Sequence, residues 1–402
     1  MSEVREGRRG ARPARVRPLA LAICLVLAGA LNHLGAAPGP PCRLVLTGQD
    51  AAGQTIFRTV ALPLAGSGLV AAPLHVLERG GVRWERLMVG MEGMPDQDAT
   101  KIVSVAALDP AGDFAYLEAP GLPGCALEPD PAGAGEGGLA QRSLPQDTMA
   151  VLVLRERSGY RPAQVGGRVE RVIDLPNRRR LILARLLDGR GADPGLLLDA
   201  DGGLIGSVAP SPAGCDPGLV VAIVATLRIP PPGDVLADRS PRLRIPPRSS
   251  PSISETLPGL VSEALLLAGS GRTEPALLRL DEALRRGGES AALLLERGVL
   301  HYAAGHLPAA IADLSGAAQA DPTRHLARFN LGMALGASGR YADAAEAFRQ
   351  ARDLAPDHAR TRFQLALALK AAHLGAAVQA EVESLDRLDP TLGRELRIIL
   401  GF

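Results

Sequence analysis

The sequence predicts a chain of two folded regions, an all-β region followed by an all-α region of helical repeats. Residues 43–228 contain short apolar runs between Gly- and Pro-rich turns, such as 149–154 and 181–187, which is typical of β-strands. The interval 230–258 is rich in proline. From residue 257 onward, small residues and prolines recur with a spacing of 34 residues, which indicates repeated helix pairs.

The N-terminal residues 1–37 have the pattern of a secretory signal. Arginines precede an apolar run over residues 18–31, and small residues follow up to Ala37. The apolar run is short for a membrane span, which needs about 20 apolar residues. We expect a periplasmic or secreted protein, and an uncleaved N-terminal anchor in the inner membrane is the alternative.

Composition limits the kinds of function. With 402 residues, 47% of them hydrophobic, the chain has enough apolar material for two cores. The net charge of +1 argues against nucleic acid as a partner. Outside the leader, Cys42, Cys125 and Cys215 allow one disulfide and one free thiol without identifying the pair. The cysteines and histidines are too scattered for a zinc site, and we predict no metal and no cofactor.

Three motifs follow one another in the β region. They are GSGLVAAPLHVL (66–77), KIVSVAALDPAGDFAYLEAP (101–120) and GADPGLLLDADGGLIG (191–206). In this order they resemble the motifs of trypsin-like serine proteases of the HtrA type. The resemblance implies a double β-barrel over residues 43–228. It places His75 at the catalytic histidine, Asp113 at the triad aspartate, Asp193 at the nucleophilic serine and Gly191 near the oxyanion pocket.

The nucleophile position lacks a hydroxyl. One register of the third motif places Asp193 there and the other places Pro194. Acyl transfer needs an activated attacking oxygen, and Pro194 also restricts the backbone of the residue before it. We interpret Ser67, Ser207 and Ser211 as structural. We therefore expect an inactive pseudo-protease, and an active periplasmic endopeptidase with unusual catalytic residues is the alternative.

The first motif also differs from the protease pattern in the length of one segment, and this difference affects the expected fold. The segment between Gly68 and His75 is shorter than the strand, turn and strand that the protease family has at this place. We expect a shortened hairpin before His75. The segment 129–138, rich in Gly, Ala and Pro, is expected to link the two β-barrels.

The helical repeat resembles the tetratricopeptide repeat (TPR), in which each unit is a pair of antiparallel helices. The repeating positions include Gly298 and Gly332, then Gly305 and Gly339. We predict units at 257–290, 291–324, 325–358 and 359–392, with the remaining tail to residue 402 covering the last unit. The fourth unit has His373 where the others have glycine.

The resemblance to TPR proteins implies a concave groove, lined by the first helix of each unit, that binds a protein or peptide. The groove positions are Glu296, Val299, Tyr302, Phe329, Asn330, Met333, Arg360, Phe363, Gln364 and Lys370. Only Asn330 and Arg360 match the family's carboxylate clamp, so we do not expect capture of a peptide C-terminus. The alternative for each apolar position is packing between helices.

The proline-rich interval is assigned to a linker at residues 229–256. Prolines at this density favour an extended, semi-rigid chain, so we expect the linker to hold the two regions apart. Together these features predict an exported adaptor protein. Its partner is a protein or peptide, and any membrane contact is made through the N-terminal segment.

Overall fold

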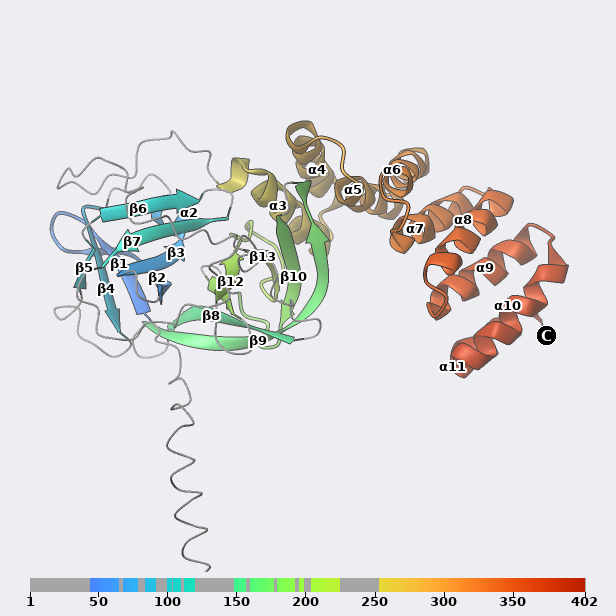
Figure 1. Cartoon of the computed structure of the whole chain (residues 1–402), viewed down its shortest axis with the longest axis horizontal. Helices are drawn as coiled ribbons and strands as arrows, with labels where there is room; N and C mark the ends of the chain where they lie inside the picture. The colour runs from blue at the N-terminus through green and yellow to red at the C-terminus, as the bar shows by residue number, and fades with distance from the viewer. Residues whose placement is uncertain are drawn as a thin grey trace, which may run out of the picture. The chain divides into compact units, whose positions relative to one another are not determined.

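The N-terminal region is β-rich, as the sequence predicts, and its strands form two units (Figure 1). The computed structural model describes residues 44–64, 68–78, 84–91, 100–102, 104–109, 112–119, 148–156, 160–176, 179–191, 195–198, 204–224 and 253–401. The first unit contains β1 (Leu44–Gln49), β2 (Thr55–Leu64), β3 (Leu69–Pro73), the helix α2 (Leu74–Glu78), β4 (Arg86–Met91), β5 (Thr100–Lys101), β6 (Ser104–Asp109) and β7 (Phe114–Glu118). Within the described residues these strands form one sheet in the order β5-β4-β1-β2-β3-β7-β6.

The second unit is a closed barrel. It contains β8 (Thr148–Glu156), β9 (Tyr160–Asp174), β10 (Arg180–Leu186), β11 (Gly195–Leu198), β12 (Leu204–Val208) and β13 (Leu219–Val224), in the order β10-β13-β12-β11-β8-β9. Strands β8 and β10 confirm the strands predicted from the apolar runs at 149–154 and 181–187. The expected link at 129–138 lies outside the described residues.

Two barrel strands are apolar on both faces. In β13, Val220 and Ala222 belong to the barrel interior, whereas Val221 and Ile223 belong to a cluster on the outer face. β10 divides its side chains in the same way between the two clusters. Because successive side chains of a strand point to opposite faces, an apolar strand of this kind needs a cover on both sides.

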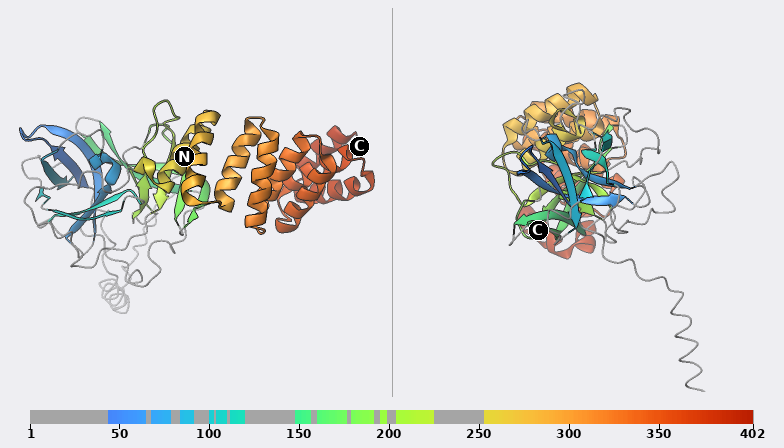
Figure 2. Two further views of the ribbon diagram at one scale, coloured as in Figure 1. Left: turned by 90° about the horizontal axis from the view of Figure 1, so that it is seen from above. Right: turned by 90° about the vertical axis from the view of Figure 1, so that its left-hand side faces the viewer.

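The C-terminal region is all-α, and consecutive helices pack side by side (Figure 2). After the short 3-10 helix η5 (Ile253–Glu255) come α3 (Leu257–Gly269), α4 (Thr273–Gly287), α5 (Ala291–Ala303), α6 (Leu307–Ala320), α7 (His325–Ala337), α8 (Tyr341–Leu354), α9 (Ala359–Ala371), α10 (Gly375–Leu388) and α11 (Pro390–Leu400). The helices α3, α5, α7 and α9 begin 34 residues apart and are called the first helices below. Among the described residues, no helix combines the length and the apolar character that crossing a membrane requires.

The repeated glycines have two structural causes. Gly305 and Gly339 lie in turns with φ near +80°, and His373 occupies the matching turn at φ 58°. Gly298 and Gly332 instead allow close helix packing: a Cβ at Gly332 would lie 2.7 Å from the ring of Phe348. Small residues at such points let two helices approach closely.

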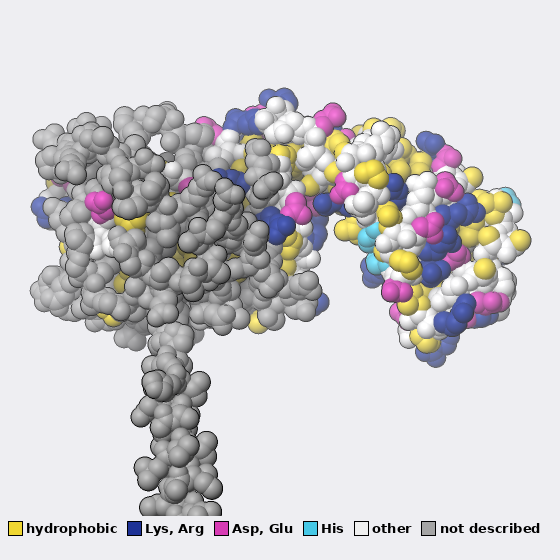
Figure 3. Space-filling view, in the orientation of Figure 1, with side chains coloured by type: hydrophobic (Ala, Val, Ile, Leu, Met, Phe, Trp, Pro, Cys, Tyr) yellow, Lys and Arg dark blue, Asp and Glu magenta, His cyan; other side chains and the backbone are white. Residues whose placement is uncertain are grey.

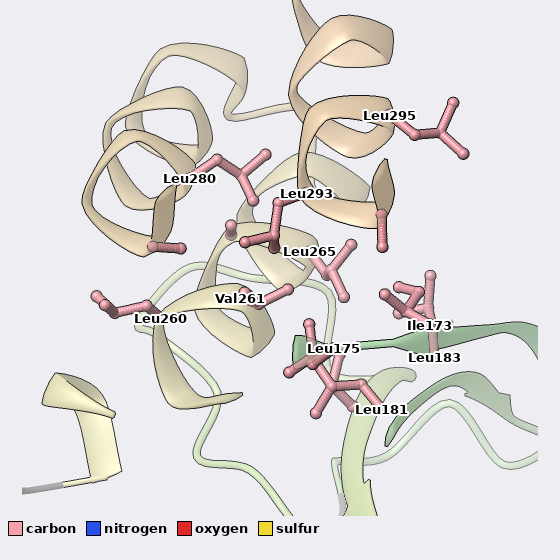
Figure 4. Close-up of a cluster of buried hydrophobic side chains, with 14 of the residues drawn as sticks. Ile173, Leu175, Leu181, Leu183, Leu260, Val261, Leu265, Leu280, Leu293 and Leu295 are labelled. Atoms are coloured by element: carbon pink, nitrogen blue, oxygen red, sulfur yellow. The ribbon is translucent and has the colours of Figure 1, made fainter. Parts of the chain in front are cut away.

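The helices pack directly against the outer face of the barrel (Figure 4). Leu181 and Ile173 of the barrel share one buried cluster with Val261 and Leu265 of α3. A Cβ at Gly269 would lie 2.2 Å from a methyl carbon of Leu219 on β13, so barrel and helix are in close contact. The expectation that the proline-rich linker holds the two regions apart is therefore wrong, because the apolar outer face of the barrel needs a cover and α3 supplies it.

Candidate functional site

A buried cluster of three polar side chains lies between the two β units. The Nδ1 atom of His75, on α2, is 2.6 Å from Oδ2 of Asp113, which precedes β7. The backbone N–H of His75 donates to Oδ1 of the same carboxylate at 2.8 Å. The hydroxyl of Ser207, on strand β12 of the barrel, donates to Oδ2 at 2.6 Å. The structure thus brings together two of the residues that sequence comparison singled out.

The backbone conformation of Asp113 helps to place its carboxylate. Asp113 has a φ of 61°, a left-handed conformation that non-glycine residues seldom adopt and that aspartate tolerates better than most. Its own carbonyl accepts a hydrogen bond from the N–H of Leu74 at 3.0 Å. Asp113 therefore binds the first turn of α2 through both backbone and side chain, which fixes the position of His75. Strained backbone of this kind is concentrated at functional sites.

His75 does not lie on a shortened strand hairpin. Strand β3 ends at Pro73 and the helix α2 begins at the next residue, so His75 is reached by a strand followed directly by a helix. This arrangement needs fewer residues than strand, turn and strand, which explains the short spacing after Gly68.

The cluster has part of the arrangement used in general-base catalysis. A carboxylate bound to Nδ1 of a histidine fixes the orientation of the ring. Ser207, however, is completely buried and directs its proton to Asp113, so its hydroxyl is not placed as a nucleophile. Asp193 and Pro194 lie outside the described residues. Gly191 is exposed and lies near Pro217, and its predicted role near an oxyanion pocket stays a prediction.

The predicted TPR groove positions separate into two groups. Glu296 is buried on α5, and its two carboxylate oxygens accept hydrogen bonds from Nη1 of Arg171 on β9 at 2.9 and 2.7 Å. Val299 and Tyr302 pack against the cluster that the barrel and α3 share. These three positions thus belong to the part of the helical region that is joined to the barrel.

The second group lies on α7 and α9. Phe329, Met333 and Phe363 are partly buried and pack against a separate apolar cluster. Asn330 donates its side-chain N–H to the carbonyl of Leu326 at 2.9 Å. Gln364 is partly buried, and Arg360 and Lys370 are exposed. This second group is named the α7–α9 face: Phe329, Asn330, Met333, Arg360, Phe363, Gln364 and Lys370.

Two histidines lie beside the α7–α9 face. The rings of His325 and His358 have centroids 4.7 Å apart, and Phe329 packs edge-on against His358. Burial lowers the pKa of His325, and the neighbouring His358 lowers it further. The pKa of His358 is lowered by burial and then by Arg360. Figure 3 shows His, Lys and Arg side chains interspersed with hydrophobic and acidic ones on the visible side of the helical region.

Sequence reasoning missed three kinds of contact residue. Val261 and Leu265 precede Phe329 and Met333 by two repeats of 34 residues and meet the barrel. Arg171 has no local motif, since its partner Glu296 lies 125 positions away. Ser207 is a serine in an apolar strand, and only the fold brings it to Asp113.

Cys215 carries a free thiol, while Cys42 and Cys125 lie outside the described residues.

Comparisons with known proteins concern the helical region. Sequence models of the tetratricopeptide repeat match residues 325–358 and 261–325. No curated protein matches the chain. Solved structures that are similar include YrrB, described as a TPR protein with an unusual peptide-binding site, at 18% identity over 36% of this chain and 75% of that chain, with a TM-score of 0.34. Another is MamA from Desulfovibrio magneticus RS-1, at 18% identity over 34% of this chain and 77% of that one, with a TM-score of 0.33.

The helix pairs, the glycine turns and the close contacts at Gly298 and Gly332 agree with the matches to the sequence models. Residues 261–358 of the helical region therefore contain tetratricopeptide repeats, which support interaction with another protein.

Proposed function

We propose that the protein is an exported adaptor that binds a protein partner through the α7–α9 face of its TPR region. The β region serves in this proposal as a catalytically inactive, trypsin-like scaffold. TPR repeats support protein–protein interaction. The remaining parts of the proposal depend on the geometry of the repeats and on the residues of the β region.

The observation that carries the proposal is a repeated surface position. Val261 and Leu265 of α3 bind a protein surface within this chain, the outer face of the barrel. Phe329 and Met333 occupy the same positions two repeats later, on α7. They pack beside α8 and α9 and remain partly exposed. Positions that bind the barrel in the first repeat are therefore available to another protein in the third.

A capture experiment tests this function. We expect the immobilised full chain to retain a protein from a cell-envelope extract, and a Met333→Glu/Phe363→Glu variant to lose it. A matched variant, Leu278→Glu on α4, changes a side chain that is 69% exposed and lies away from the α7–α9 face. Equal retention by all three proteins would exclude the α7–α9 face as the binding surface.

The inactive state of the β region is supported by the chemistry around His75. Within the described residues, the hydroxyl of Ser207 reaches the His75–Asp113 pair, and it donates to the carboxylate. We expect neither labelling by a serine-directed fluorophosphonate nor cleavage of a casein substrate. Labelling that disappears in a His75→Ala variant would instead establish the endopeptidase alternative.

A further inference from the structure

The helices α7 and α9 contain no acidic residue. Their charged side chains are Arg328 on α7 and Arg360, Arg362 and Lys370 on α9. The first helices of the two earlier repeats differ, because α3 contains Glu263 and α5 contains Glu296. The composition of the first helices therefore changes along the stack, from acidic in α3 and mixed in α5 to exclusively basic in α7 and α9.

The two earlier glutamates are neutralised within the chain. Glu263 pairs with Arg279 at 3.0 Å, and Glu296 pairs with Arg171 of the barrel at 2.7 Å. An acidic partner approaching from the side of α7 and α9 would therefore meet no unpaired carboxylate on α3 or α5. In addition, the contact of the barrel with α3 and α5 leaves the later repeats as the place for a second protein.

The basic residues of α9 are not equivalent. Arg362 is paired with Glu381 of α10 at 3.0 Å, so its charge is already balanced. Arg360 is exposed, and the ion pairs of the described residues do not include it. Lys370 is exposed at the other end of the same helix. A carboxylate placed near Arg360 would meet a cation that no described acidic group neutralises.

Arg360 and Lys370 flank an apolar stripe. Phe363 and Leu367, both partly buried, lie between them at successive spacings of three, four and three residues, so all four share one side of the helix. Phe329 and Met333 supply the corresponding apolar positions on α7. The surface thus combines apolar contacts with cationic ends.

From this pattern we propose that the partner is an acidic protein segment with apolar side chains. Its apolar side chains pack on Phe329, Met333 and Phe363, and a carboxylate lies near Arg360. The inference rests on the proposed function, because it specifies the chemistry of the partner that binds the α7–α9 face. Complementary charge of this kind mainly sets selectivity and the rate of association.

Fluorescence anisotropy with three synthetic peptides tests the proposal on the full chain. The probe is a labelled, C-terminally amidated dodecapeptide built from Glu-Glu-Phe and Glu-Glu-Leu triplets. The two comparison peptides carry Gln or Lys in place of every Glu. We expect the Glu peptide to bind at least about tenfold more tightly than the Gln peptide at low salt, and the difference to shrink at high salt.

A pair of matched variants locates the binding surface. We expect Arg360→Gln to weaken binding of the Glu peptide about fivefold, because one charge contact is lost. Arg285→Gln, at an exposed arginine of α4, should leave the affinity within about twofold. Circular dichroism would verify that both variants are folded.

The outcomes separate this proposal from the proposed function. Equal binding of the Glu and Gln peptides, tighter binding of the Lys peptide, no binding of any peptide, or equal effects of the two arginine variants would each overturn the acidic-segment proposal. The envelope capture with the Met333→Glu/Phe363→Glu variant decides the proposed function independently, because it does not depend on the charge of the partner.

Discussion

Arg171 and Glu296 join the barrel to the second helix pair: the guanidinium of Arg171 donates to both carboxylate oxygens of Glu296 across 125 positions of the chain. The Glu296 side chain is only 10% exposed, whereas that of Arg171 is 43% exposed. The contact therefore pairs the nearly buried negative charge of Glu296 with the positive charge of Arg171, which solvent partly screens.

Removing Arg171 would leave that carboxylate without its cation. We expect Arg171→Ala to lower the free energy of unfolding by about 1 kcal/mol, measured by guanidinium titration. Arg180→Ala, which breaks the more exposed pair with Asp174, should cost less than about 0.5 kcal/mol. If the two variants lost the same free energy of unfolding, the contact between Arg171 and Glu296 would contribute no more to stability than an exposed ion pair.

Asp113 is expected to be essential for the stability of the β region. Its buried carboxylate accepts from the backbone and the ring of His75 and from Ser207. Asp113→Ala should cost about 3 kcal/mol and Ser207→Ala about 1–2 kcal/mol in the free energy of unfolding. The exposed Ser211→Ala serves as the control, and a cost for Ser207→Ala no larger than for this control would contradict the prediction.

Gly332 and Gly336 give opposite predictions on the same helix. A Cβ at Gly332 would lie 2.7 Å from the Phe348 ring, whereas one at Gly336 would lie 3.8 Å from the Cβ of Ala344. We expect Gly332→Ala to destabilise the protein by about 1–3 kcal/mol because it overpacks the contact. Gly336→Ala should stabilise it by up to about 1 kcal/mol because alanine favours the helix. Thermal unfolding of both variants measures these changes. If both substitutions changed the stability in the same direction, the packing argument would be wrong.

His373 occupies a left-handed turn that the other repeats fill with glycine. We expect His373→Gly to raise the free energy of unfolding by about 0.5–1 kcal/mol, since glycine adopts this conformation without steric strain. The reverse change, Gly339→His, should destabilise by about 1 kcal/mol. A destabilised His373→Gly protein would show that the histidine side chain makes a contact worth more than the strain.

The His325–His358 pair predicts a dependence on pH. Burial lowers the pKa of both rings from the ordinary value of 6.5. Between the folded and unfolded pKa values the unfolded chain binds more protons, so the free energy of unfolding is highest above about pH 6.5 and falls as the solution is acidified. Unfolding titrations should show a smaller loss on acidification in His325→Phe, which keeps the aromatic contact without the titrating group. An unchanged pH dependence would exclude His325 as a contributor.

The helical repeats could be predicted from the sequence because each contact recurs in it. Gly332 and Phe348 belong to one repeat unit, so their contact is local in sequence and has a counterpart in Gly298 and Leu314. Matches to TPR sequence models confirm the repeats. The trypsin-like origin of the β region stays a prediction, although His75 and Asp113 lie together.

The sequence analysis did not predict that the barrel packs against the helices, although the sequence of β13 indicates a strand that is covered on both faces. The run LVVAIV has no polar alternation, so both of its faces need a cover, but periodicity alone does not identify which segment provides it. A bulge in β9 between the partners of Leu183 and Ala184 also shifts its register, so that Val169 belongs to the interior and Ile173 to the outer cluster. Arg171 lies just beyond this bulge. If the inside–outside alternation of side chains before the bulge is continued through it, the residues after the bulge are assigned to the wrong face of the barrel.

The shared core of barrel and α3 makes the two ends of the helical stack unequal. In a repeat array each unit is stabilised by its neighbours, and an end without a neighbour opens first. Here the barrel serves as the neighbour of the first helix pair, whereas the last helix, α11, leaves Ile398 80% exposed. Amide hydrogen exchange should therefore be slowest at α3 and quicken toward α11. A chain cut after the linker would lose this anchoring and expose Val261 and Leu265 to water, so we expect the first helix pair and the barrel to unfold together.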